Sequence, residues 1–387
     1  MVRVVMALVD SARLIFSIIL LATASLAVVI APTHFLWMVA VGVTELGHML
    51  LFICLAAIPF VWSSSWAGKS SALMCLAAAV LASIPVLRAI RVDHELPAEL
   101  RAAFGEATPS RSAPLVYGDL FKGISPLEIS AETLVYSTTD GQELSLDFYR
   151  AQSERAVPLV VVIHAGSWQS GDNRDFISMD RYLAGHGYAV ADIVYRLAPR
   201  WKFPAATDDT RAAIVFLRSH AEKFKIDPNR IVLLGRSAGG QIALTVAYSA
   251  KDPAIRGVIS FYAPTDLYYS WENPGNPLVL DTKTILIDYL GGSPAEAPAI
   301  YNDASPTRLV TPDSPPTLLL HGGRDELVSF HQSARLAKRL DEVGIPHLNL
   351  LLPWATHGFD YILRGPGGQI STYAIEYFLE AVTREPR

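Results

Sequence analysis

Cysteine is scarce in this chain, which contains only Cys54 and Cys75, both inside apolar runs near the N-terminus. A disulfide-stapled scaffold is therefore excluded, and the sequence is compatible with either redox compartment. No Cys/His spacing typical of a metal site and no G-x-x-x-x-G-K-[ST] phosphate loop occurs either. We expect neither a metal nor an organic cofactor.

Positive charge is also sparse. The 32 lysines and arginines are outnumbered by 37 acidic residues, which leaves a net charge of −5, and they form no cluster. Nucleic-acid binding depends on a basic surface and is therefore unsupported. The sequence has no internal repeat and no low-complexity tract, which argues against a repeat architecture.

Apolar residues, by contrast, are abundant. They make up 51% of the chain, the mean hydropathy is +0.29, and the excess lies before residue 90. Apolar runs at 14–31, 35–62 and 72–90 are each long enough to cross a bilayer. We therefore expect residues 1–91 to form a three-helix transmembrane region. Tryptophans near the run ends fit the aromatic belts of membrane interfaces: Trp37, Trp62 and Trp66.

The orientation of this region is less defined. Ala22-Thr23-Ala24 matches a signal-peptidase site, but the apolar run continues through it, so we favour an uncleaved first span. Positive charges near the span ends divide three against three, so the positive-inside rule does not decide: Arg3, Arg13 and Lys69 against Arg88, Arg91 and Arg101. We favour a multi-pass membrane protein with a cytoplasmic N-terminus and an extracytoplasmic C-terminal domain.

Glu45 and His48 lie on one face of the second run. Ionisable groups inside a membrane are costly and are candidates for a metal or proton site. Two ligands are too few for a confident metal site, and polar side chains also hold helices together. We favour the packing role.

The motif Gly235-Arg236-Ser237-Ala238-Gly239-Gly240 is the strongest chemical signal in the C-terminal part. It follows the apolar run 231–234 and precedes the helix-like stretch 241–248, which is the strand–turn–helix context of a nucleophilic serine. Glycines flank the serine because side chains there would collide with the neighbouring strand or helix. An ordinary glycine-rich turn is the competing interpretation.

A serine nucleophile needs a base and an acid, and in this context they follow it along the chain as acid, then histidine. Asp325 comes just after the buried-strand pattern 317–321, and His357 follows the strand-like stretch 347–353. We predict that Ser237, Asp325 and His357 form a catalytic triad. His321, within the end of a strand, is a weaker candidate for the base, and Glu326, in the turn beside Asp325, is a weaker candidate for the acid.

A third strand-like run, 158–163, leads into His164-Ala165-Gly166-Ser167-Trp168. Small residues there let the backbone N–H groups approach an oxyanion, with Ala238 after the nucleophile as a further donor. His164 and Trp168 are more compatible with packing roles than with chemistry.

From about residue 134 to 378, the sequence resembles the α/β-hydrolase superfamily. It is most similar to esterase/lipase families with a His-Gly-Gly-x-Trp loop, including hormone-sensitive-lipase-like carboxylesterases and relatives of feruloyl esterases and formamidases. The resemblance rests on residues 164–168, 195–199, 203–205, 227–231, 235–240, 321–325 and 357–358. It implies that the oxyanion donors are Gly166, Ser167 and Ala238.

Ala165 and Arg236 depart from the family's pattern. Ala165 replaces the family's first glycine, which leaves the placement of one oxyanion donor open. Arg236 stands where such enzymes often carry Asp or His, and we expect it to pair with Asp208 or Asp209. An Arg196–carboxylate bridge is expected to steady the loop beside the site.

The expected fold class is α/β: an α/β-hydrolase fold with a mostly parallel eight-stranded sheet flanked by helices, preceded by the transmembrane region. A hairpin around Asp140-Gly141 opens it. We expect a linker at 92–126, the catalytic domain at 127–387, and a small aromatic-rich lid at about 264–312.

The expected activity is hydrolysis of a small-molecule or lipid-like carboxylic ester through an acyl-enzyme, in a membrane-anchored carboxylesterase. An amidase or peptidase with the same triad, and a membrane-tethered binding protein with a vestigial hydrolase domain, are the alternatives. The ester itself and the oligomeric state do not follow from the sequence.

Overall fold

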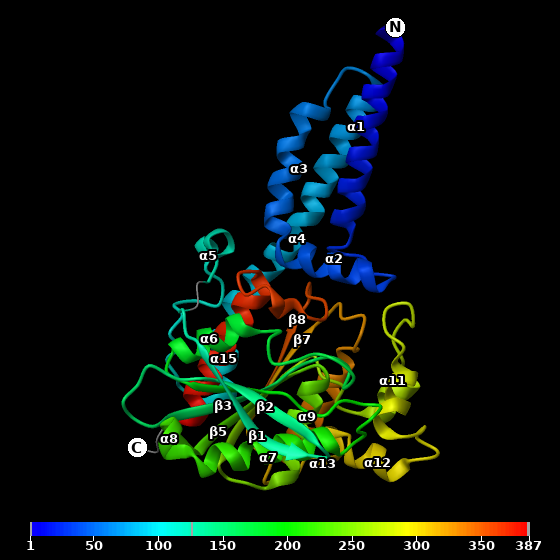
Figure 1. The fold of residues 1–387 in the computed structure, drawn as a ribbon. Helices are drawn as coiled ribbons and strands as arrows, with labels where there is room; N and C mark the ends of the chain where they lie inside the picture. The colour runs from blue at the N-terminus through cyan, green and yellow to red at the C-terminus, as the bar shows by residue number, and fades with distance from the viewer. Residues whose placement is uncertain (1, 125–126, 385–387) are drawn as a thin grey trace.

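The computed structural model describes residues 2–124 and 127–384 and divides them into a helical stalk and a broad α/β domain. In Figure 1, α1, α3 and α4 run side by side away from the domain, and α2 lies across their base. Helix α1 begins at the far tip of the stalk.

One eight-stranded sheet organises the domain, in the order β1-β2-β4-β3-β5-β6-β7-β8. The first two pairings, β1–β2 and β2–β4, are antiparallel, and all the others are parallel. The strands are β1 Ala131–Thr139, β2 Gln142–Tyr149, β3 Val157–Ile163, β4 Ala189–Ile193, β5 Ile226–Arg236, β6 Ile255–Phe261, β7 Thr317–Gly322 and β8 His347–Leu352. The expected fold class of the domain is thus observed.

Strand residues alternate between two hydrophobic cores because successive side chains point to opposite faces of a sheet. On β5, Ile231 and Leu233 belong to one core and Val232 and Leu234 to the other. The first core is covered by α7 (Ala205–Ser219), α9 (Ala238–Ala250) and α14 (His331–Val343). The second core is covered by α4 (Trp66–Phe104), α6 (Ile177–Gly185) and α15 (Pro366–Thr383).

The remaining helices are short except for those of the stalk. They are α1 Val2–Ser25, α2 His34–Glu45, α3 Gly47–Val61, α5 Tyr117–Lys122, α8 Ala221–Phe224, α10 Leu267–Glu272, α11 Thr282–Leu290, α12 Pro298–Asp303 and α13 Pro306–Leu309, with a 3₁₀ turn η1 at Phe359–Tyr361.

The stalk differs from the expected three straight spans. Within the described residues, two helices are long and apolar enough to cross a membrane, Arg3–Ser25 and Trp66–Phe104. The run 35–62 is not one helix: α2 and α3 meet at 85° around Leu46. A third span is present only if this bent pair is counted as one. Hydropathy alone does not register a bend, because both arms are apolar.

Helix α4 joins the stalk to the domain without a break. The expected linker begins at residue 92, but α4 continues to Phe104 and buries Leu96 and Leu100 completely in the second core. The expected lid at 264–312 contains four short helices, α10 to α13.

Glu45 and His48 do not face each other. Glu45 Oε2 accepts hydrogen bonds from the N–H groups of Gly367 (2.7 Å) and Gly368 (3.4 Å) at the start of α15. His48 Nε2 lies 2.9 Å from the carbonyl oxygen of Leu120. Both side chains therefore attach the stalk to the rest of the chain, and their contacts fit the packing role.

Replacing Glu45 by alanine tests this attachment. The substitution removes the acceptor for two N–H groups at a helix start, and we expect the free energy of unfolding to fall by about 1–2 kcal/mol. Thermal unfolding in detergent measures the change. Glu95→Ala is the control, because Glu95 forms an exposed pair with Arg91; equal destabilisation by both changes would contradict the role of Glu45.

Candidate active site

Ser237 lies on a sharp turn between β5 and α9, with φ 53° and ψ −118°. A Cβ on Gly235 would come 2.1 Å from the Gly239 carbonyl oxygen, and one on Gly239 would come 2.2 Å from that of Ile163. Only glycine fits at either position, so the turn is built by the two flanking glycines. A non-glycine residue held at positive φ is strained, which is frequent at functional turns.

Asp325 and His357 are brought together by the ends of β7 and β8. His357 Nδ1 lies 2.7 Å from Asp325 Oδ2, and both side chains are buried. Because a carboxylate only accepts hydrogen bonds, His357 Nδ1 carries the proton and Nε2 is left as the basic nitrogen. This is the arrangement expected of the acid and base in a triad.

The Asp325 carboxylate is held by further donors. Its Oδ1 accepts the N–H groups of Leu327 (2.9 Å) and Val328 (2.8 Å). His321 Nε2 lies 3.3 Å from Asp325 Oδ2. The sequence did not predict this contact. Burial alone would raise the pKa of Asp325, but His357 and His321 lower it to about 2.

The end of strand β6 connects the Ser237 turn with His357. The Ser237 N–H donates to the Phe261 carbonyl (2.9 Å), and the next residue, Tyr262, packs its ring 4.2 Å from the His357 ring. Within the described residues, no hydrogen bond joins Ser237 Oγ to His357. In structures without substrate, such bonds are commonly long and tighten in the reactive complex.

Ser237 opens into a cavity with about 530 Å³ of empty space, its mouth included. Ser167 and Ala238 border the serine, and the more distant wall combines apolar and polar side chains. Its members are Trp168, Pro264, Tyr269, Ser270, Asn273, Gly275, Leu280, Thr282, Ile285, Leu286, Leu327, Val328, Ser329 and Gln332.

The predicted oxyanion donors lie on two tight backbone turns. Gly166 has φ +120° and Ser167 has φ 54°, and a Cβ on Gly166 would come 1.9 Å from the Ser170 carbonyl oxygen. Across residues 2–124 and 127–384, the N–H groups of Gly166, Ser167 and Ala238 donate to no protein acceptor. Ser167 and Ala238 border the cavity, whereas Gly166 is not part of its lining.

Comparison with known proteins places this geometry in a family. The sequence profile of the BD-FAE family matches residues 146–340, half of the chain. The chain belongs to the BD-FAE family. These proteins are feruloyl-esterase-like α/β-hydrolases, in agreement with the resemblance noted from the motifs.

Individual relatives agree with the family assignment. Esterase LipC of Mycobacterium tuberculosis is 30% identical over 257 residues, which cover 62% of this chain and 62% of LipC. The ethyl acetate hydrolase of Pseudomonas putida is 28% identical over 239 residues, covering 58% of this chain and 74% of that protein. The chain thus spans less than two thirds of LipC.

A solved structure supports the fold. An esterase of Rhizomucor miehei superimposes with a TM-score of 0.58 at 24% identity, covering 69% of this chain and 88% of that one. At this identity the likeness establishes the α/β-hydrolase fold of the BD-FAE domain and nothing finer.

Two ring-bearing residues of the 164–168 loop have packing roles, as expected. The His164 ring stacks on Tyr195 at 4.1 Å, and its Nδ1 lies 2.6 Å from the Ala165 carbonyl oxygen. Burial lowers the pKa of His164 to about 4, so the ring is neutral at physiological pH. Trp168 donates to Gln241 (2.9 Å) and stacks on Tyr289 at 4.2 Å.

The prediction that Arg236 pairs with Asp208 or Asp209 is wrong. Arg236 Nε lies 2.6 Å from Asp360 Oδ2, with both side chains fully buried, and its guanidinium sits 3.8 Å over the Phe176 ring. Alternation along β5 explains the error: Arg236 points to the same face as Leu234, whereas Asp208 and Asp209 lie on α7 across the sheet. The charge beside Ser237 is therefore neutralised away from the cavity.

The second arginine behaves as expected. Arg196 Nη2 lies 2.8 Å from Asp209 Oδ1, and its Nη1 lies 2.6 Å from Asp140. The bridge connects the segment after β4 with α7 and with the β1–β2 hairpin, which fixes the loop next to the site.

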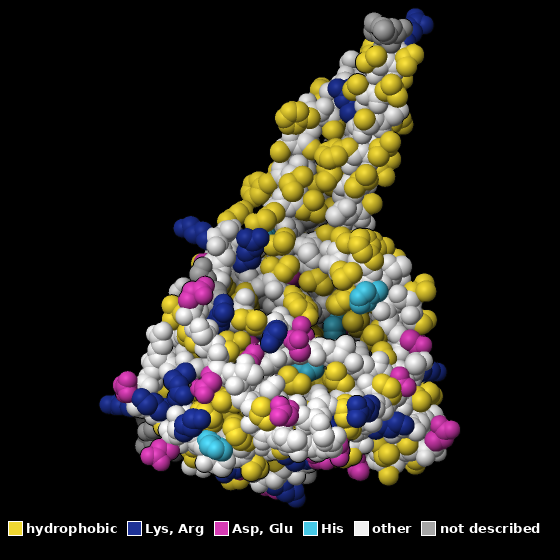
Figure 2. Space-filling model, in the orientation of Figure 1, with side chains coloured by type: hydrophobic (Ala, Val, Ile, Leu, Met, Phe, Trp, Pro, Cys, Tyr) yellow, Lys and Arg dark blue, Asp and Glu magenta, His cyan; other side chains and the backbone are white. Residues whose placement is uncertain are grey.

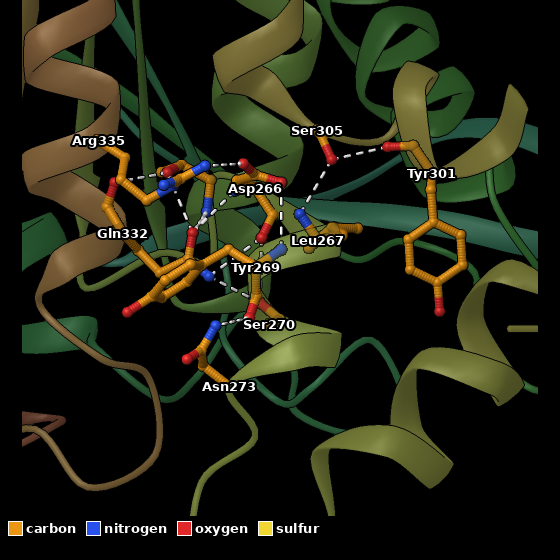
Figure 3. A network of polar contacts seen from close by, with 10 residues as sticks. Asp266, Leu267, Tyr269, Ser270, Asn273, Tyr301, Ser305, Gln332 and Arg335 are labelled. Atoms are coloured by element: carbon orange, nitrogen blue, oxygen red, sulfur yellow. Dashed lines mark hydrogen bonds and ion pairs between the residues drawn. The ribbon is translucent and has the colours of Figure 1, made fainter. Parts of the chain in front are cut away.

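A buried polar network fixes one wall of the cavity (Figure 3). Gln332 Oε1 accepts the N–H groups of Thr265 (3.0 Å) and Asp266 (2.8 Å), and its Nε2 donates to Ser270 (2.7 Å). Arg335 adds an ion pair with Asp266 at 2.8 Å. These bonds attach the start of α10 to α14, so this wall does not depend on apolar packing alone.

Contacts with the stalk reach the same loops and were not anticipated. Trp37 on α2 donates from Nε1 to the His357 carbonyl oxygen (3.1 Å). Arg324, next to Asp325, donates to the carbonyl oxygens of Leu26 (2.9 Å) and Val29 just beyond α1. No local sequence signal links these positions, which are about 300 residues apart.

Glu326 is a buried acid beside the site, near the charge of Arg324. It is 8% exposed, and neither carboxylate oxygen has a hydrogen-bond partner within the described part of the chain. Burial and the neighbouring Asp325 raise the pKa of Glu326 to about 7. The side chain is therefore protonated in the folded protein at mildly acidic pH.

Glu326→Gln should remove a pH dependence of stability. The folded pKa of Glu326 exceeds the unfolded value of 4.5, so wild-type stability falls as pH rises from about 4.5 to 7. Above pH 7 the variant should be more stable than wild type by as much as about 3 kcal/mol, and at pH 4 the two should agree. Unfolding in detergent at both pH values measures this.

Glu272→Gln is the matched control, because Glu272 is exposed. A Glu326→Gln variant whose stability follows the wild-type pH curve would show that Glu326 is not buried as an acid.

Proposed function

We propose that this chain is a membrane-anchored serine hydrolase that cleaves carboxylic esters through Ser237, His357 and Asp325. The observation that carries the proposal is the 2.7 Å contact between His357 Nδ1 and Asp325 Oδ2 at the edge of the sheet where the Ser237 turn projects. Membership of the BD-FAE family and the esterase relatives support the reaction class.

In the proposed reaction, Ser237 Oγ attacks the ester carbonyl carbon and His357 Nε2 accepts its proton. The tetrahedral intermediate collapses, the ester C–O bond breaks, and His357 returns the proton to the departing alcohol. Water then attacks the acyl-enzyme with His357 again as base, which releases the acid and restores Ser237. Asp325 stays ionised throughout, which its low pKa favours.

Charge on the carbonyl oxygen is stabilised in this proposal by the N–H groups of Ala238, Ser167 and Gly166. They lack protein acceptors in the described residues, as an oxyanion site requires. Ala165 is outside the proposed donor set, and its carbonyl oxygen lies 2.6 Å from His164 Nδ1. The cavity position of Ser167 makes it the firmer donor of the loop pair.

An amidase or peptidase using the same three residues is the alternative. The relatives named above are esterases, and one hydrolyses ethyl acetate, which favours esters. Rates on a p-nitrophenyl ester and on the matching acyl-anilide separate the two activities. A binding protein with a vestigial site is less compatible, since all three residues are present and two are in contact.

Membrane anchoring is proposed from the stalk. Helices α1 and α4 meet the length and polarity of membrane spans, and the stalk surface is largely apolar in Figure 2. Counting the bent pair gives a multi-pass anchor, with the catalytic domain proposed to be extracytoplasmic. The N-terminal span is retained in this proposal.

Ser237→Ala should abolish covalent labelling by a fluorophosphonate, because the probe reacts with an activated serine oxygen. Wild type and variant are compared in sealed vesicles with a membrane-impermeant probe, which also reports the side of the membrane. Ser167→Ala, which keeps the backbone donor, is the control and should still label. Labelling that survives in Ser237→Ala would place the nucleophile elsewhere.

Trp37→Phe should slow the reaction without weakening substrate binding, because it removes the hydrogen bond that holds the His357 backbone. Loss of one such bond, about 1–1.5 kcal/mol, corresponds to a fall in kcat of roughly tenfold. Kinetics on a water-soluble ester separate kcat from KM. Trp62→Phe is the control, since Trp62 is 57% exposed at the end of α3; an unchanged kcat in Trp37→Phe would exclude this positioning role.

A further inference from the structure

Three exposed apolar side chains lie where the stalk meets the catalytic domain. Phe35 and Met38, on α2, are 66% and 51% exposed, and Leu278, in the loop between α10 and α11, is 71% exposed. Phe35 and Met38 are three residues apart and therefore share a face of α2. We call these three residues the lip.

Backbone contacts join the two segments of the lip. The His34 N–H donates to the Leu278 carbonyl oxygen at 3.2 Å. Asn276 Nδ2 donates to the Pro32 carbonyl oxygen at 3.0 Å. The loop and the start of α2 therefore lie side by side, although about 240 residues separate them in the chain.

The same loop forms part of the cavity wall. Asn273, Gly275 and Leu280 line the cavity that contains Ser237, and Leu278 lies between the last two in sequence. On the other side, α2 reaches the site through Trp37 and the His357 backbone. The lip therefore adjoins a loop that lines the cavity on one side and a helix that contacts the His357 backbone on the other, although its own side chains are not part of the cavity lining.

The direction of α2 places the lip at a bilayer surface. Because α2 and α3 meet at 85°, α2 runs almost parallel to the membrane when α3 crosses it. A helix in that plane with an apolar outer face is typical of interfacial anchoring. Figure 2 shows apolar side chains continuing from the stalk onto the adjoining part of the domain, with some Lys and Arg side chains at one side of the stalk base.

We propose that the lip inserts into the bilayer surface and that the substrate is an ester of a membrane-resident amphiphile, which enters the cavity from the lipid. The proposal rests on the proposed esterase function. Hydrolysis adds water across the ester C–O bond, and the product that carries the long chain returns to the bilayer. Continuity with the apolar stalk favours lipid over a protein partner as the occupant.

The test uses the full chain in phosphatidylcholine vesicles and two substrates. One is p-nitrophenyl acetate, which is water-soluble, and the other is a fluorogenic long-chain ester dissolved in the bilayer. For Met38→Ser/Leu278→Ser we expect the bilayer-ester rate to fall by roughly tenfold, since apolar anchoring area is lost, and the acetate rate to stay within about twofold. Val215→Ser is the control.

Val215 is 67% exposed on α7, at the opposite end of the domain from the stalk. An unchanged bilayer-ester rate, or an equal fall in both rates, would overturn the lip proposal. Wild type inactive on both esters would instead overturn the esterase function, so the two failures are distinguishable.

A second measurement does not depend on activity. Leu278→Trp adds a fluorophore to the lip, and its added emission should be quenched by vesicles of brominated phosphatidylcholine. Val215→Trp should not be quenched. Equal quenching, or none at position 278, would place the lip in water and overturn the proposal.

Discussion

The Asp325 carboxylate accepts two backbone N–H groups and the His357 ring, and it lies against His321. These bonds hold the site in place, because they join the loops after β7 and β8 around one buried charge. A buried carboxylate is stable only when its oxygens are engaged. The parallel sheet supplies this arrangement by ending adjacent strands at the same edge, where the Ser237 turn also projects.

Much of the domain was predictable because its signals are local. Alternating apolar residues mark each strand, the two glycines around Ser237 mark the turn, and chain order marks Asp325 and His357. The sequence also indicated the packing roles of His164 and Trp168. The Ser237–His357 relation and the oxyanion donors stay predictions, since they depend on a bound substrate for their final geometry.

What escaped prediction depends on contacts between distant segments. The Arg236–Asp360 pair joins residues 124 apart, and the choice of partner follows from which face of β5 the side chain occupies. The 85° bend between α2 and α3 falls next to Glu45 and His48, and polar residues within an apolar run do not by themselves specify a bend. The extension of α4 to Phe104 is stabilised by burial of Leu96 and Leu100, which tertiary packing alone decides.

The stalk takes part in the architecture of the site. Carbonyl groups beyond the end of a helix need hydrogen-bond donors, and the Arg324 guanidinium donates to those of Leu26 and Val29. The residue next to Arg324, Asp325, binds His357. Trp37 holds the backbone of His357 from the opposite side. A displacement of α1 or α2 therefore moves both Asp325 and His357. Under the proposed function, a membrane that fixes these helices also fixes the distance on which proton transfer depends.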